Sequence, residues 1–159
     1  ARLCVNEAAL RESIALGGPD WEEAVLVSYH RLSRIPRWLD DGINPDWEVA
    51  HRAFHRRLVE ACGSKWLVGY CEQLFDAADR YRHVSRLAPQ AHSRPHIDEH
   101  RAIMEATLAR AADEAVELLK QHFVKTADLC LSQMRQAGPG SGPGPARAGS
   151  RRRGRAAAE

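Results

Sequence analysis

Apolar residues recur at the spacing of an α-helix throughout residues 1–136, and this periodicity constrains the fold more than any other feature of the sequence. No segment alternates apolar and polar residues for long enough to predict a β-strand. Start and stop signals divide the region into about six helices, at residues 1–16, 20–35, 45–63, 64–87, 96–110 and 112–135. Short connections between successive helices favour antiparallel packing. The predicted fold class is therefore all-α, an antiparallel helical bundle.

Three capping signals support the predicted helix starts. Asp20 and Glu23 have the spacing of a capping box, in which the Asp side chain accepts a hydrogen bond from the N3 amide and the Glu reaches back. Asn44 precedes Pro45, and Asn as N-cap with Pro at the first helical position is a typical helix start. Ser64 is predicted to cap the long fourth helix.

The 159-residue chain is predicted to form one helical domain, residues 1–136, and a disordered tail, residues 137–159. The tail is rich in Gly, Pro and Ser and then in Arg, a composition that cannot bury enough apolar surface to order itself. It carries five arginines and one acid, a net charge of +4, which leaves −2 for residues 1–136 out of the total of +2. The domain therefore lacks the basic footprint of a nucleic-acid-binding domain. The tail is expected to be a solubilising extension or to contact nucleic acid weakly and nonspecifically.

The sequence gives no signal for export or for a membrane. It contains no run of about 18 apolar residues and no segment with the charged start, apolar middle and cleavage site of a signal peptide. Its four cysteines have no CxxC or metal-knuckle spacing, which fits free thiols in a reducing compartment. We expect a cytoplasmic protein with no membrane partner.

Four histidines fall on the apolar stripes of three predicted helices. His51 and His55 are four residues apart and share one helix face, while His100 and His122 lie on the stripes of the last two helices. Four inward imidazoles from three helices predict a shared metal ion, and imidazole suits zinc, nickel, iron or copper better than magnesium or calcium. The alternative is that each ring is a core histidine bonded to a backbone carbonyl or a water. The other histidines are expected on the surface or in loops: His30, His83, His92 and His96.

Four runs of sequence, in this order and spacing, are specific enough to suggest a family. They are ALRESIALGGPDWEEAV (9–25), WEVAHRAFHRRLVEACGSKWL (47–67), RYR (80–82) and DEHRAIMEATLARAADEAVELLKQHF (98–123). Together they resemble the C-terminal effector-binding (FCD) domain of FadR-type regulators in the GntR family of bacterial transcription regulators. They are most similar to the branch that includes the glutarate-responsive CsiR repressor. The resemblance covers nearly all of residues 1–136.

The resemblance implies an all-helical bundle, a homodimer, and a metal held by an Asp and a His four residues apart plus two later histidines. The metal ligands here would be His51, His55, His100 and His122, with His51 in place of the usual Asp. We expect a divalent transition metal, zinc or nickel. Ala111 stands where the family commonly has an Asp opening the last helix, a lost cap that costs about 1 kcal/mol. The family's winged helix-turn-helix has no counterpart in these residues, so operator DNA is expected as a partner only through a missing N-terminal domain.

Site chemistry predicts a small carboxylic acid as the effector. A metal held by neutral imidazoles keeps its positive charge and can accept a carboxylate oxygen. Arg82 is expected to hold a second carboxylate in a bidentate pair, with Tyr81 and Arg80 as further ligand-binding residues. Ordinary surface ion pairs are the alternative for these arginines.

Two other classes of function stay open at this point. A metal-dependent hydrolase would need a carboxylate base near the ion, and the nearest in sequence, Glu48 and Glu99, are predicted to face solvent. The sequence contains no HExxH motif and no nucleophile elbow. A structural or adaptor bundle would need no small ligand. The preferred prediction is a non-enzymatic, ligand-sensing domain of a bacterial transcription regulator.

Overall fold

The computed structural model describes residues 1–40 and 42–137. Over these residues the chain forms eight helices and one short β-hairpin, which confirms the all-α prediction. The elements are α1 (Arg2–Leu16), α2 (Pro19–Arg34), β1 (Trp38–Leu39), β2 (Gly42–Ile43), α3 (Pro45–Val59), α4 (Lys65–Ala77), α5 (Asp79–Arg86), α6 (Gln90–Ser93), α7 (His96–Leu108) and α8 (Ala112–Ala137). Of the predicted tail, residues 137–159, the first residue belongs to α8, and residues 138–159 lie outside the described residues.

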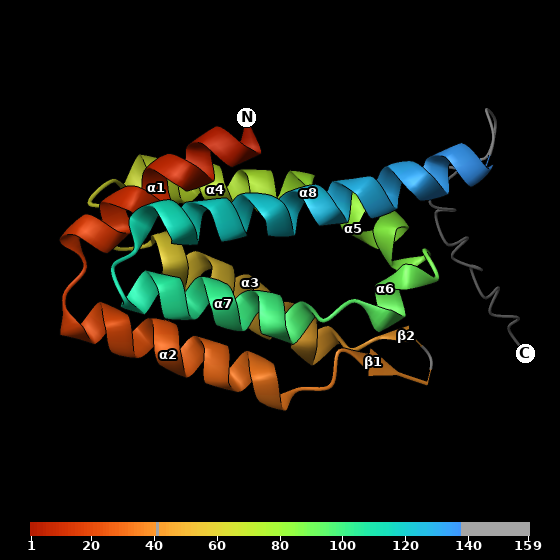
Figure 1. Ribbon diagram of the computed structural model, residues 1–159, viewed down its shortest axis with the longest axis horizontal. Helices are drawn as coiled ribbons and strands as arrows, with labels where there is room; N and C mark the ends of the chain where they lie inside the picture. Colours follow the sequence, from red (N-terminus) through yellow and green to blue (C-terminus); the bar gives the residue numbers. More distant parts are fainter. Residues whose placement is uncertain (41, 138–159) are drawn as a thin grey trace, which may run out of the picture.

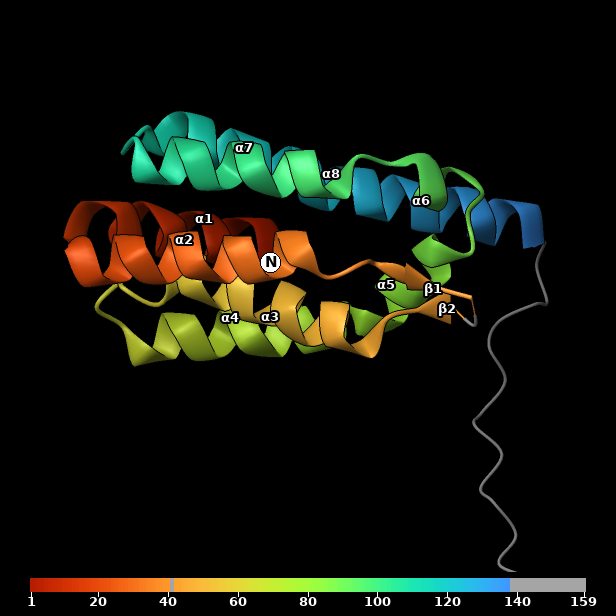
Figure 2. The same cartoon turned by 90° about the horizontal axis from the view of Figure 1, so that it is seen from below.

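The helices run along a common direction in layers. Figure 2 shows α7 and α8 on one side, α3 and α4 on the other, and α1 and α2 between them. In agreement with this view, α1 packs against α4 and α8, whereas α2 packs against α3 and α7. The long α8 extends past the other helices, and α5 packs against it (Figure 1).

The apolar faces of these helices meet in one core. Its fully buried members include Leu10, Val25, Leu32, Phe54, Leu58 and Ile103. Trp21 is also buried, and its indole N–H donates to the Arg57 carbonyl at 2.7 Å, which satisfies the one polar group of that side chain. None of the helices in the described ranges is both long and apolar enough to cross a membrane.

Two of the three predicted caps are confirmed. The Asn44 side chain accepts a hydrogen bond from the backbone N–H two residues later at 3.0 Å, and the Ser64 hydroxyl accepts one from the N–H three residues later at 3.3 Å. The capping box at Asp20 is wrong, because α2 begins at Pro19 with Gly18 as its N-cap and no side-chain cap. The fixed φ of Pro19 suits the first helical position, so the helix starts before Asp20 can act as the cap.

The described part of the chain has eight helices instead of the predicted six, because one predicted helix is divided in two and one short helix was not predicted. The predicted fourth helix is two helices, α4 and α5, divided at Ala78, whose N–H still donates to the Leu74 carbonyl at 3.1 Å. The connection before α3 contains an antiparallel hairpin that pairs Trp38 with Ile43, and the loop before α7 contains the single turn α6. Elements of two to four residues are too short to show a period in the sequence.

The turn between α7 and α8 fixes one end of the bundle. The Ala111 carbonyl accepts from the Ala115 N–H at 2.9 Å, so Ala111 occupies the N-cap without a side-chain oxygen, as the resemblance implied. Arg110 just before it has a φ of 58°. Its guanidinium donates to the Gly17 carbonyl at 2.6 Å and to the Glu22 carboxylate at 3.0 Å, which ties this turn to the turn between α1 and α2.

Candidate metal centre

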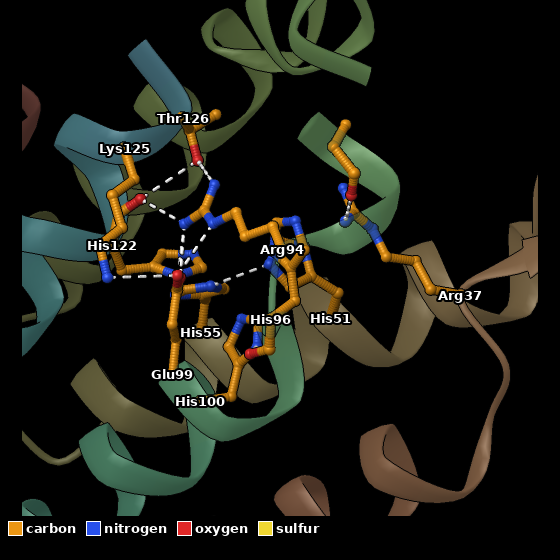
Figure 3. A network of polar contacts seen from close by, with 11 residues as sticks. Arg37, His51, His55, Arg94, His96, Glu99, His100, His122, Lys125 and Thr126 are labelled. Atoms are coloured by element: carbon orange, nitrogen blue, oxygen red, sulfur yellow. Dashed lines mark hydrogen bonds and ion pairs between the residues drawn. The ribbon is translucent and has the colours of Figure 1, made fainter. Parts of the chain in front are cut away.

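Four imidazoles from three helices meet in the middle of the bundle. The histidine cluster consists of His51 and His55 from α3, His100 from α7 and His122 from α8. All four side chains are buried, and one nitrogen from each ring lies within 4.8 Å of one nitrogen from every other ring. Figure 3 shows the rings converging where α3 faces α7 and α8. The structure thus brings together all four residues that the sequence singled out as metal ligands.

Aromatic neighbours hold the α3 pair in place. The Trp47 ring stacks on His51 with 4.6 Å between centroids and 12° between planes. Phe54 packs edge-on against His55 at 5.6 Å, and Phe75 from α4 lies 5.9 Å from the same ring. The i, i+4 spacing places both imidazoles on the inner face of α3, where the rings meet edge-on with their Nε2 atoms 3.0 Å apart.

The outer ring nitrogens of the other two histidines have fixed partners. His100 Nδ1 donates to the His96 carbonyl at 2.6 Å, and His122 Nδ1 lies 2.8 Å from the Glu99 carboxylate. These bonds define the tautomer in which Nε2 carries a free lone pair, and His100 Nε2 is buried with no hydrogen-bond partner within the described part of the chain. Metal-binding histidines usually make this kind of outer bond to a carboxylate or a backbone carbonyl.

The cluster is uncharged at neutral pH. Burial lowers the pKa of His51, His55 and His100 well below the usual value for histidine, and the neighbouring imidazoles lower the pKa values further. Burial also lowers the pKa of His122, although the Glu99 carboxylate partly offsets that effect. A neutral imidazole is the form that binds a metal.

The donor set fits a divalent transition metal. Bonds of about 2.1 Å to one ion place two nitrogens on opposite sides of it about 4.2 Å apart and two tetrahedral ligands about 3.4 Å apart, so a gap of 4.8 Å would need to close by about 0.6 to 1.4 Å. Four neutral nitrogen donors suit zinc, nickel or copper, whereas magnesium and calcium prefer oxygen. The lone pair of His100 Nε2, buried and unused within residues 1–40 and 42–137, is the clearest sign that the cluster suits an ion.

The sequence predicted that Glu99 faces solvent, and this prediction is wrong. Its side chain is only 10% exposed and accepts hydrogen bonds from Arg94 Nε at 2.9 Å as well as from His122 (Figure 3). Burial opposes ionisation of Glu99, but these hydrogen bonds and the Arg94 charge outweigh it and hold the pKa of Glu99 well below its usual range. Arg94 also donates to the His122 carbonyl and to the Thr126 hydroxyl, both at 2.9 Å.

Five arginines surround a small chamber beside the histidine cluster. The chamber has a volume of about 20 Å³ and is also lined by His51 and His122. Its arginines are Arg2, Arg37, Arg82, Arg86 and Arg94. Three of them pair with acids: Arg82 with Asp79, Arg86 with Glu48, and Arg94 with Glu99. A concentration of positive charge at a buried site favours an anionic ligand.

Arg37 is the most distinctive of these cations. It follows α2, and its guanidinium lies 4.8 Å from the Trp38 ring and 5.1 Å from the Trp47 ring. It donates to the Ala91 carbonyl of α6 at 3.1 Å, while its Nε is buried with no partner in the described ranges. Burial, with the nearby positive charges of Arg86 and Arg94, lowers the pKa of Arg37 to about 10, so it stays charged at neutral pH.

Of the three predicted ligand-binding residues, only one lines the chamber. Arg82 lines the chamber, but its guanidinium already donates to the Phe75 carbonyl at 2.7 Å and to Asp79 at 3.1 Å. Tyr81 is 49% exposed, and Arg80 is exposed with its guanidinium 5.3 Å from the Tyr81 ring. Tyr81 and Arg80 therefore lie outside the chamber.

The prediction for the remaining histidines is wrong at one position. His30, His83 and His92 are exposed, as expected. His96 instead lines the chamber, with its Nε2 buried and without a partner in the residues described. Burial and the nearby charge of Arg37 lower the pKa of His96 far below the usual value for histidine. His96 begins α7, one turn before His100, and this i, i+4 spacing places both side chains on the same face of the helix.

Comparison with known proteins agrees with this architecture. The profile of the FCD domain matches residues 1–125, and the chain belongs to this family, the effector-sensing domain of GntR-type transcription regulators.

Two curated relatives are both described as transcriptional regulators. One is an uncharacterized HTH-type transcriptional regulator, BphR of Paraburkholderia xenovorans (strain LB400), with 35% identity over 143 residues that cover 86% of this chain and 55% of the relative. The other is the HTH-type transcriptional repressor GlaR of Escherichia coli (strain K12), with 36% identity over 139 residues that cover 84% of this chain and 63% of the relative. The chain thus spans less than two thirds of the length of either relative. No solved structure matches the chain.

Proposed function

We propose that this domain senses a small carboxylic acid for a bacterial transcription regulator, and that it does so beside a divalent transition metal, zinc or nickel, held by the histidine cluster. The observation that carries the proposal is the convergence of four neutral, buried imidazoles with their donor nitrogens within 4.8 Å. The outer bonds of His100 and His122 support it, because they present the Nε2 atoms to a shared ion.

An acidic effector fits the charge around the cluster. Neutral ligands leave the charge of a bound metal uncompensated, and the ion would supply an electrophilic position for a carboxylate oxygen. Arg37 contributes a partly buried positive charge that has no carboxylate partner in residues 1–40 and 42–137. An anion placed between the cluster and Arg37 would neutralise both, so we assign Arg37 rather than Arg82 as the main cation for the effector.

The site supports a sensor better than an enzyme. A hydrolase needs a carboxylate that is free to take a proton from water, whereas Glu99, the acid nearest the cluster, is already bonded to His122 and Arg94. The relatives' descriptions as transcriptional regulators agree with a role in binding. An acid that ties α3, α7 and α8 to the segment carrying Arg37 would stabilise one arrangement of the bundle and shift a homodimer toward it. In a cytoplasmic regulator, an attached helix-turn-helix domain would convert that shift into a change in operator binding.

Metal analysis and thermal unfolding test the proposal. We expect about one zinc or nickel ion per purified chain, with the content reduced at least tenfold in His55→Ala and His122→Ala. His30→Ala is the matched control, because His30 is exposed on α2. Mono- and dicarboxylic acids should raise the melting temperature of the metal-loaded chain and have a smaller effect after chelation. A chain that binds no metal in any preparation, and that no acid stabilises, would contradict the proposal.

A further inference from the structure

The chamber beside the histidine cluster is too small for most organic acids. Its volume of about 20 Å³ accommodates roughly one water molecule. A much larger groove lies next to it, between α1, the α4–α5 segment and the second half of α8, with a volume of about 480 Å³. Sites for organic ligands typically measure about 300 to 1,000 Å³. The groove, and not the chamber, is therefore large enough to hold the body of an organic ligand.

The groove and the chamber share a wall. Arg2, Arg82, Phe123 and Thr126 line both cavities. The Arg2 guanidinium lies 3.7 Å from the centroid of the Phe123 ring, and the Arg82 guanidinium lies 3.9 Å from that of Phe75. The inner end of the groove is thus formed by two guanidinium groups that rest on aromatic rings next to the cluster.

Apart from Tyr81 and the Cys130 thiol, the rest of the groove is apolar. Its lining includes Leu3, Leu74, Val124, Ala127, Leu131 and Met134. Val124, Leu131 and Met134 are 45%, 48% and 55% exposed, which is unusual for a row of large apolar side chains on one helix face. A contiguous exposed apolar surface with a few polar groups at one end is typical of a binding site.

Arg2 carries a positive charge that no carboxylate within residues 1–40 and 42–137 neutralises. Its Nε is buried without a hydrogen-bond partner in the described ranges, and none of the carboxylates there forms an ion pair with its guanidinium. Burial lowers the pKa of Arg2 to about 10, so the guanidinium is still charged at neutral pH. Arg82, by contrast, already pairs with Asp79. A partly buried charge without a partner is costly, and a ligand carboxylate would remove that cost.

We propose that this groove binds the hydrocarbon body of a monocarboxylic acid, such as a medium-chain fatty acid, whose carboxylate lies at the shared wall, where Arg2 and the chamber arginine Arg37 both contribute positive charge to its binding. The inference rests on the proposed acid-sensing function and specifies the class of effector. The apolar lining favours a hydrocarbon body over a second carboxylate, because burying a charge against Leu3, Leu131 and Met134 would be costly. Phe123, which lines both cavities, directly follows His122 in α8, so an acid group at this wall would lie close to the histidine cluster.

Calorimetric titration of the zinc-loaded 159-residue chain with acetate, butyrate, hexanoate, octanoate and glutarate tests the proposal. Each added methylene should increase affinity about fourfold as it is buried, and octanoate should bind more tightly than glutarate. Ala127→Glu places a carboxylate on the exposed rim of the groove and should weaken octanoate binding at least tenfold while leaving acetate binding unchanged. Gln121→Glu adds the same group elsewhere on α8 and should change neither. Arg2→Gln should weaken the binding of every monocarboxylate.

Three results would overturn the groove as the site. The first is an affinity that does not depend on chain length. The second is glutarate binding that exceeds octanoate binding and is unaffected by Ala127→Glu. The third is a dimer that dissociates in Ala127→Glu without any change in acid affinity, which would make the groove an interface between copies. All three leave acid sensing at the cluster intact, whereas metal-loaded protein that binds none of the acids contradicts the proposed function itself. Chain-length-dependent binding that persists after chelation would support the groove and remove the metal from the proposed function.

Discussion

Replacing Glu99 by Gln should weaken metal binding without touching a predicted ligand. The Glu99 carboxylate accepts from His122 Nδ1 at 2.8 Å, so it fixes the tautomer of His122 and makes its Nε2 more basic. Loss of such an outer bond typically lowers metal affinity 10- to 100-fold, or about 1.4 to 2.8 kcal/mol. Because the Arg94 and Glu99 side chains are only 7% and 10% exposed, breaking their ion pair should also destabilise the fold, by about 3 to 5 kcal/mol.

The two effects are separated by measuring them independently. Zinc affinity is measured by competition with a chromophoric chelator, at a temperature where circular dichroism shows the variant to be folded. Urea unfolding in EDTA measures stability alone. Glu105→Gln is the matched control, because Glu105 is exposed on the same helix, α7. A folded Glu99→Gln variant with the zinc affinity of the unmodified chain would refute the reasoning that links Glu99 to the metal centre.

Three further predictions concern packing, pH and charge. Gly17→Ala should cost about 1 to 3 kcal/mol in urea unfolding, because the added Cβ would meet the Trp21 ring at 2.1 Å, whereas Gly18→Ala, with no atom within 4 Å, should cost much less. Burial depresses the pKa of the clustered histidines, so the unfolded metal-free chain binds more protons than the folded one below about pH 6.5. The stability that these neutral rings contribute is complete above that pH and is lost as pH falls, by about 1.4 kcal/mol per pH unit per histidine, and urea titrations of His51→Gln should show a shallower slope. Arg37→Met should keep or raise the melting temperature while it abolishes stabilisation by acids, and undiminished acid binding would count against the role of Arg37.

The regular parts of the fold were predictable because their signals are local. The caps at Asn44 and Ser64 each depend on contacts within three residues, and the long helices repeat their apolar period several times. The misplaced cap at Asp20 reflects a competition between two local signals, in which Pro19 at the first helical position prevailed. The hairpin and α6 could not be predicted, since their placement depends on tertiary contacts such as the bond from Arg37 to the Ala91 carbonyl.

The candidate site also has a part that the sequence predicts and a part that it does not. The histidine cluster could be predicted because helical periodicity directs side chains toward the core. The roles of Arg37, Arg94 and Glu99 could not, because two of these residues lie outside regular helices and the third is oriented by its ion pair. The orientation of a charged side chain depends on partners far away in sequence, and periodicity carries no information about them.

X-ray absorption at the zinc edge of the metal-loaded chain tests the central claim most directly. Binding by the histidine cluster predicts a first shell of nitrogen or oxygen atoms at about 2.0 to 2.1 Å, with the outer scattering of imidazole rings, and no sulfur shell near 2.3 Å. Sulfur scattering from the cysteines, or a shell of water oxygens without imidazole scattering, would contradict a metal centre built from these four histidines.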